Sequence, residues 1–120
     1  MVCTLKHRNG VVVPPAARMT DISLNPADVH GCNGCPHGVQ GPALSGSSNT
    51  IVAGQALLRA RGADNGVHAG CCGPNIWVTM QGSTKVYCND LPVVRVGDAT
   101  THCGGVGSII TGATQVIIGG

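Results

Sequence analysis

One pattern returns three times along the chain, and it constrains the fold more than any other feature. Each copy has a triplet of small apolar residues, then an arginine, then an aspartate a few residues on. A repeat has to be identified first, because missing it misreads the whole fold. The copies are Pro15-Ala16-Ala17-Arg18 with Asp21, Ala56-Leu57-Leu58-Arg59 with Asp64, and Pro92-Val93-Val94-Arg95 with Asp98.

A second pattern also has three copies, and each leads into a short run of residues that favour β-strands. Because the spacing between copies is irregular, the connecting loops must differ in length. The copies are Gly46-Ser47, Gly82-Ser83 and Gly112-Ala113, followed by Thr50-Ile51-Val52, Lys85-Val86-Tyr87 and Gln115-Val116-Ile117-Ile118.

The repeated units are typical of β-hairpins. Residues 50–52 and 56–59 flank Ala53-Gly54-Gln55, and residues 86–88 and 93–96 flank Asn89-Asp90-Leu91-Pro92. Short β-branched runs separated by Gly, Asn and Asp are hairpin signals. Residues 53–61 have the propensity for one short helix, but the alignment of the repeats argues against it. No stretch shows sustained helical periodicity with caps, so we expect an all-β fold.

The composition indicates many tight turns around a thin aliphatic core. The chain has 19 Gly, 7 Pro and no Phe, while hydrophobic residues make up 42% and the formal net charge is only +2. Disorder would need lower hydrophobicity and higher net charge. The interior must be built from Val, Ile, Leu and Ala, with Trp77 as a packing anchor. At 120 residues we expect one domain, residues 1–120, in which residues 1–13 are an N-terminal lead-in.

Charge and hydropathy exclude several classes of function. A net charge of +2, without aromatic platforms for stacking bases, is too weak for a nucleic-acid binder. No run approaches the roughly 20 apolar residues of a membrane span. The first ten residues lack the apolar stretch and the small-residue cleavage site of a signal peptide, so we expect synthesis and folding in the cytoplasm.

The cysteine count favours metal binding over disulfides. There are seven cysteines, so a full disulfide framework would leave one thiol over. A reducing compartment also favours metal binding. Cys3 and Cys88 lie away from the histidine-rich segments, and we interpret them as buried thiols that pack as small hydrophobes. A disulfide-stapled extracellular binding module is the alternative, and counting free thiols separates the two.

Histidine and cysteine fall in three clusters, residues 30–37, 68–72 and 102–103, which predict a metal site at one end of the molecule. His68 and His102 each follow their repeat's aspartate by four residues. Cys35 and His37 are two residues apart, so in an extended segment their side chains share a face. Zinc accepts imidazole and thiolate in closed tetrahedral sites. The preferred ligands are therefore Cys35, His37, His68 and His102, with His30, Cys32, Cys72 and Cys103 in reserve.

Such a site would staple the three loops, and its binding energy would become folding energy. Iron is an alternative to zinc because imidazole-rich sites accept several metals. Catalysis has weaker support. Cys71 or Cys72 beside His68 could act as a nucleophile, but acids that would orient the histidine are scarce. A redox pair of Cys32 and Cys35 lacks the βαβ context expected for it. We interpret the Arg–Asp pairs as turn-fixing ion pairs and do not expect an enzyme.

The ordered series of motifs resembles the PAAR-repeat proteins, whose name-giving motif stands here as Pro15-Ala16-Ala17-Arg18. The resemblance covers roughly residues 14–120, nearly the whole chain. Further segments that carry it are residues 30–37, Gly46-Ser47, residues 68–75 with Trp77, residues 94–98, residues 102–105 and residues 116–120.

The resemblance implies a short conical fold of three β-hairpin repeats, with pseudo-threefold symmetry and a zinc near the vertex. It implies a structural role as the cap of a trimeric VgrG-type or phage-type spike, as in type VI secretion and related contractile injection systems. The base would dock on the homotrimer as a monomer, and the point would contact a target membrane transiently as it pierces it. Effector proteins are further implied partners, and the spike would carry the cap to the cell exterior or into the target cell.

The first copy departs from the other two. It reads Met19-Thr20-Asp21 where the third copy reads Val96-Gly97-Asp98. It also has Asn25 where the spacing of the other copies places His68 and His102. Its ligand must therefore come from the longer loop, and the choice among His30, Cys32, Cys35 and His37 stays open.

Overall fold

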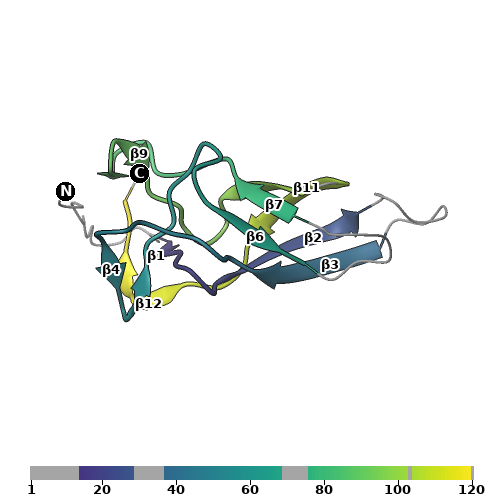
Figure 1. Cartoon of the computed structure of the whole chain (residues 1–120), viewed down its shortest axis with the longest axis horizontal. Helices are drawn as coiled ribbons and strands as arrows, with labels where there is room; N and C mark the ends of the chain where they lie inside the picture. Colours follow the sequence, from purple (N-terminus) through teal and green to yellow (C-terminus); the bar gives the residue numbers. More distant parts are fainter. Residues whose placement is uncertain (1–13, 29–36, 69–75, 103, 120) are drawn as a thin grey trace.

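The computed structural model of the chain describes residues 14–28, 37–68, 76–102 and 104–119. Within these residues the protein is all-β, as predicted, and forms an elongated body of 47 × 31 × 21 Å (Figure 1). No helix in this part of the chain is long and apolar enough to cross a membrane. The strands are β1 (Pro15–Ala16), β2 (Ile22–Asp28), β3 (His37–Pro42), β4 (Ile51–Val52), β5 (Gln55–Ala56), β6 (Asn65–Val67), β7 (Ile76–Thr79), β8 (Tyr87–Cys88), β9 (Leu91–Pro92), β10 (Ala99–His102), β11 (Gly105–Ile109) and β12 (Ala113–Ile117).

Six strands form one antiparallel sheet at one end of the molecule (Figure 1). Their order is β3-β2-β11-β10-β7-β6, so the sheet consists of three hairpins laid side by side. The two edges of the sheet approach each other where Ala43, directly after β3, bridges to Gly66 on β6. Next to this bridge the amide of Leu44 donates to the carbonyl of Asn65 at 2.8 Å. The sheet is therefore nearly closed.

Three two-stranded ribbons occupy the opposite end of the molecule, which we call the base. They are β4–β5, β8–β9 and β1–β12. The two ends of the described chain meet here, because the amide of Ile118 donates to the carbonyl of Pro14 at 3.0 Å. Each copy of the repeat thus contributes to a ribbon at the base and a hairpin in the sheet.

A closed ring of backbone hydrogen bonds joins the three copies between the base and the sheet. The amide of Leu58 donates to the carbonyl of Ala17 (3.0 Å), that of Ala17 to Val94 (2.9 Å), and that of Val94 to Leu58 (3.1 Å). All three are the third residues of their triplets, so the predicted alignment of the repeat is confirmed. A second cycle of backbone hydrogen bonds has the same symmetry: the amide of Met19 donates to the carbonyl of Ala56, that of Ala60 to Pro92, and that of Val96 to Pro15.

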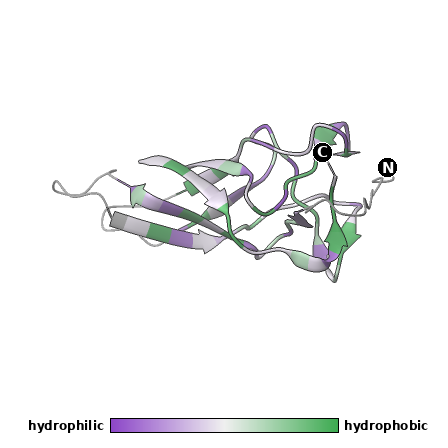
Figure 2. Ribbon diagram, turned by 180° about the vertical axis from the view of Figure 1, so that it is seen from behind, coloured by the Kyte–Doolittle hydropathy of each residue, from purple (hydrophilic) through white to green (hydrophobic). Residues whose placement is uncertain are grey.

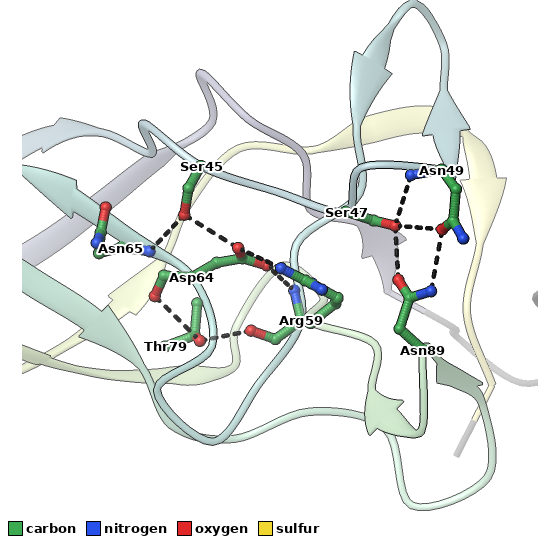
Figure 3. A network of polar contacts seen from close by, with 8 residues as sticks. All are labelled: Ser45, Ser47, Asn49, Arg59, Asp64, Asn65, Thr79 and Asn89. Atoms are coloured by element: carbon green, nitrogen blue, oxygen red, sulfur yellow. Dashed lines mark hydrogen bonds and ion pairs between the residues drawn. The ribbon is translucent and has the colours of Figure 1, made fainter. Parts of the chain in front are cut away.

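In every copy the aspartate closes a turn on its own arginine, as predicted. The carboxylate accepts hydrogen bonds from the backbone amide and from the guanidinium of that arginine. In the second copy Ser45 also donates to Asp64, and Thr79 donates to the carbonyl of Arg59 (Figure 3). Hydrogen bonds to charged groups contribute about 1.5–3 kcal/mol each, so these pairs stabilise the turns that lead into the sheet. The guanidinium–carboxylate distances are 3.2 Å for Arg18–Asp21, 3.1 Å for Arg59–Asp64 and 2.9 Å for Arg95–Asp98.

The hairpin turns at the base are tighter than predicted. Gln55 and the pair Leu91–Pro92 lie in strands rather than in loops, because each turn needs only two residues. These residues are Ala53-Gly54 and Asn89-Asp90, and all four have φ between 46° and 85°. Such values are typical of type I′ turns, whose twist matches that of the flanking strands. Residues 53–61 do not form a helix, as the alignment of the repeats predicted.

The core is aliphatic, as the composition predicts, and it has two parts. Trp77 is fully buried in the part nearer the sheet, which confirms its expected role as a packing anchor. Full burial of a Leu or Val side chain contributes about 1.5–3 kcal/mol. The part nearer the sheet contains Ala17, Ala43, Leu58, Ala60, Trp77, Val94 and Ile109, and the part at the base contains Ala16, Leu57, Val86, Cys88, Val93 and Ile118.

Cys88 corrects one interpretation. It is fully buried at the base, as expected, but it is disulfide-bonded rather than a free thiol. Every other cysteine lies outside the described residues, and so does its partner. The interpretation of Cys88 as a free thiol rested on its separation from the histidines along the sequence. That separation does not predict whether a disulfide forms, because a disulfide depends on how closely two Cα atoms approach in space.

Candidate metal centre

Three strand ends bring Asp28, His68 and His102 together at the end of the sheet that faces away from the base. Asp28 ends β2, His68 directly follows β6, and His102 ends β10. All three are buried, and one ligand atom from each lies within 4.8 Å of the others. Nε2 of His68 is 3.9 Å from Oδ2 of Asp28, and the two imidazole centroids are 4.9 Å apart. Each residue belongs to a different copy of the repeat, so the threefold arrangement itself assembles the cluster.

The structure brings together two of the four predicted ligands, His68 and His102. His37 begins β3 and is paired with Asp28 in the strand register, while its side chain is not among the described ones. Cys35 lies outside the described residues, as do all the residues held in reserve: His30, Cys32, Cys72 and Cys103.

Asp28 is a candidate ligand that the sequence pattern did not indicate. The spacing of the repeat places Asn25 at the position of the two histidines, and Asn25 is indeed buried there. A register shift between Asn25 and Asp28 lets the chain bulge and return the carboxylate to the cluster. Nδ2 of Asn25 donates to Oδ2 of Asp28 at 3.1 Å, and Oδ1 of Asn25 accepts from the amide of Ala27 at 3.1 Å. The side-chain amide of Asn25 thus orients the carboxylate of Asp28, which takes the place in the cluster where the repeat spacing puts Asn25.

Ser23, Thr100 and Trp77 fix the orientation of the His102 ring. The hydroxyl of Ser23 lies 2.8 Å from Nε2 of His102 and 2.6 Å from the hydroxyl of Thr100. The indole of Trp77 stacks on the imidazole with centroids 6.0 Å apart and an interplanar angle of 22°. Nδ1 of His102 is buried and has no hydrogen-bond partner among the described residues. The ring therefore offers Nδ1 to a metal and holds Nε2 on a polar neighbour, as metal-binding histidines generally do.

The surroundings of His102 favour the neutral imidazole that a metal requires. Burial, and after it the proximity of His68, lower the pKa of His102 from 6.5 to about 4, although the carboxylate of Asp28 acts in the opposite direction. A metal competes with protons for a ring nitrogen, so a low pKa keeps the ligand available at neutral pH.

Gly107 makes room for the same ring. It lies opposite Thr100 on the neighbouring strand β11. A Cβ at this position would stand 2.6 Å from Nε2 of His102 and 2.5 Å from the carbonyl oxygen of Leu24. Neither atom can retreat without breaking a strand or turning the ring, so only glycine fits beside the imidazole.

Two imidazoles and a carboxylate form a donor set that suits a divalent transition metal. Zinc takes nitrogen and oxygen ligands at about 2.0–2.2 Å, and two histidines with one carboxylate also ligate ferrous iron. Donors around one zinc ion stand roughly 3–3.5 Å apart, so the atoms here, all within 4.8 Å, are slightly wider than a coordinated set. A bound ion would cross-link the three hairpins of the sheet.

A comparison with models of known protein families finds no match for this chain, and no curated protein matches it.

Proposed function

We propose that this protein is a structural cap that docks by its base on a trimeric spike and presents its metal-bearing end as the tip, without catalysing a reaction. The pseudo-threefold ring at Ala17, Leu58 and Val94 carries the proposal. A monomer built from three similar copies can match the three subunits of a homotrimer at once, and closed cyclic symmetry is common among homo-oligomers. The resemblance to PAAR-repeat proteins supports the same role, with a VgrG-like spike of a contractile injection system as the partner.

Apolar side chains at equivalent positions of the base ribbons suit such docking. Ile51, Tyr87 and Ile117 are each paired with the first residue of a repeat triplet, so they are related by the pseudo-threefold symmetry. Ile51 is 63% exposed and Tyr87 41% exposed. Binding energy in interfaces is concentrated in a few such anchors. The short ribbons also leave strand edges that a β-rich partner can cover.

The metal centre at the other end has a structural task in this proposal. An ion held by Asp28, His68 and His102 ties all three copies together far from the ring, so the narrow end gains rigidity. Zinc is the proposed metal and iron the alternative. The cap would be made in the cytoplasm, carried out on the spike, touch the target membrane briefly and link effectors to the spike.

Stoichiometry tests the docking. We would mix the protein with a homotrimeric β-helical spike protein and measure the mass of the complex by light scattering. We expect one chain per trimer, and weaker binding of the double variant Ile51→Glu/Tyr87→Glu. Ile76→Glu, which changes a sheet residue whose exposure lies between those of Ile51 and Tyr87, is the control and should bind normally. Three chains per trimer, or loss of binding in the control alone, would contradict docking through the base.

A disulfide-stapled binding module is the second candidate, because Cys88 is disulfide-bonded. That candidate predicts six paired cysteines of the seven and no bound metal after purification in air. The cap predicts about one metal ion per chain and several free thiols. Thiol counting under denaturing conditions, together with elemental analysis, distinguishes the two.

A further inference from the structure

The disulfide of Cys88 lies inside the base. Cys88 ends β8, is fully buried, and belongs with Leu57 and Ile118 to the part of the core at the base. Its Sγ lies 3.6 Å from Oγ1 of Thr50, which directly precedes β4 in the neighbouring ribbon. Figure 2 shows hydrophobic residues (green) in the ribbons of the base. The partner sulfur must therefore reach the interior of the base, which limits the cysteines that can supply it.

Five of the six other cysteines belong to segments that begin and end at the opposite end of the molecule. Each of these segments connects the two strands of one hairpin of the sheet, at the end that holds the metal centre (Figure 1). None of the five is more than four residues along the chain from a described residue. They are Cys32 and Cys35 between Asp28 and His37, Cys71 and Cys72 between His68 and Ile76, and Cys103 between His102 and Gly104.

These five cysteines are too far from Cys88 to pair with it. Four residues span at most about 14 Å when fully extended, and a disulfide adds about 6 Å between its two Cα atoms. The strand β3, which leads from the metal centre toward the base, has 6 residues and extends over about 17 Å. The turn at Asp21 and the ring through Ala17 lie beyond it, and Cys88 is on the far side of that ring. A segment at the metal end would therefore be used up along the sheet, short of the buried sulfur.

Cys3 is the remaining cysteine, and its place in the chain is close to the base. The first described residue, Pro14, accepts a hydrogen bond from the amide of Ile118 at 3.0 Å, and Ile118 belongs to the same part of the core as Cys88. The eleven residues from Cys3 to Pro14 span up to about 36 Å, which exceeds both widths of the molecule, 31 and 21 Å. We propose that Cys3 is the partner of Cys88, so that a disulfide fastens the N-terminal lead-in to the base.

The bond forms by thiol–disulfide exchange and at one ribbon only. A small-molecule disulfide, such as oxidised glutathione, takes two electrons and two protons from the two cysteines and is reduced to two thiols. In the ribbon β4–β5 the position of Cys88 is held by Val52, which follows Ile51 as Cys88 follows Tyr87, so no sulfur is available there. The lead-in also contains three consecutive valines, residues 11–13, which suit the apolar surface of the base. This inference does not depend on the proposed role as a cap.

Peptide mapping tests the pairing, because trypsin separates the two cysteines from all others. Cleavage after Lys and Arg places Cys3 in residues 1–6 and Cys88 in residues 86–95, each as the single cysteine of its peptide. The zinc-loaded full chain is equilibrated with reduced and oxidised glutathione, denatured with iodoacetamide in the absence of reductant, digested and analysed by mass spectrometry. We expect residues 1–6 linked to residues 86–95. A link from Cys88 to any other peptide, or an alkylated Cys88 without a linked peptide, would overturn the proposal.

The response of stability to a reductant gives a second test. A phosphine reductant should raise the equilibrium constant for unfolding of the unchanged protein in urea about 100-fold, because the cross-link restricts the unfolded chain. Cys3→Ser should show the same loss of stability and no further response to the reductant. Cys32→Ser, the matched control at the metal end, should keep the full response. A reductant response that persists in Cys3→Ser, or that disappears in Cys32→Ser, would show that Cys88 has another partner. Neither test includes a spike protein, so both outcomes are independent of the docking proposal.

Discussion

Replacing Ser23 by alanine tests how the metal centre is held. The Ser23 hydroxyl is fully buried and joins the hydroxyl of Thr100 at 2.6 Å to Nε2 of His102 at 2.8 Å. Its removal deprives two buried polar atoms of a partner, and each such loss costs about 1–3 kcal/mol. We expect the metal-free variant to be destabilised by about 2–3 kcal/mol, allowing for partial relaxation. Because the ring of His102 would no longer be oriented, metal affinity should fall about 10- to 100-fold.

Two measurements separate these effects. Urea unfolding of the metal-free protein gives the stability change, and competition with a chromogenic chelator gives the zinc affinity. Ser108→Ala is the matched control, since Ser108 lies on the outer row of β11, opposite Ala99 and Leu24, and should change neither quantity appreciably. If Ser23→Ala binds zinc as tightly as the unchanged protein, the hydroxyl does not position a ligand, and our account of His102 fails.

Three further predictions concern the ring, its turns and the histidines. Thr20 has φ of 77° at the position where the third copy has Gly97 with φ of 94°. In urea unfolding, Thr20→Gly should stabilise the fold by up to about 1 kcal/mol, and Gly97→Thr should destabilise it by about 1–2 kcal/mol. Variants as stable as the unchanged protein would show that the backbone of Thr20 is not strained. Leu58→Ala, at a fully buried ring position, should cost about 2–5 kcal/mol in the same assay, and a loss below 1 kcal/mol would show that the ring site collapses freely. The pKa of His102 is lowered from 6.5 to about 4 in the folded protein, so the unfolded state binds a proton more readily. The stability that neutral His102 contributes to the metal-free protein should be complete above pH 6.5 and should fall by up to about 3 kcal/mol as the pH drops from 6.5 to 4. His102→Gln should remove this pH dependence.

The sequence was sufficient to predict the features that repeat. The three triplets can be aligned from the sequence alone. The hydrogen-bonded ring joins Ala17, Leu58 and Val94, which occupy the same position in that alignment. The Arg–Asp turns were equally predictable, because both partners lie within one short segment. His68 and His102 could be identified as neighbours because they share one spacing from the repeat's aspartate.

The features that break the repeat were out of reach. Asp28 joins the cluster because the strand register shifts between Asn25 and Asp28. The residues in this segment do not predict where the strand bulges. The disulfide of Cys88 depends on proximity in space, which sequence spacing does not report. The outward position of Val106 and Ile76 follows from strand pairing, and a shift of one residue would have turned both side chains inward.

The ring of backbone hydrogen bonds also bears on how the protein is made. Ala17 needs Val94 as its acceptor and Leu58 as its donor, so the first copy cannot complete its bonds when it leaves the ribosome. Contacts between residues so distant in sequence form slowly, because the intervening loops must close first. The ring therefore cannot form in the nascent chain until the third copy has emerged, and apolar residues of the first two copies stay exposed to solvent until then. In a crowded cell this interval is when the protein is most exposed to aggregation and most dependent on chaperones.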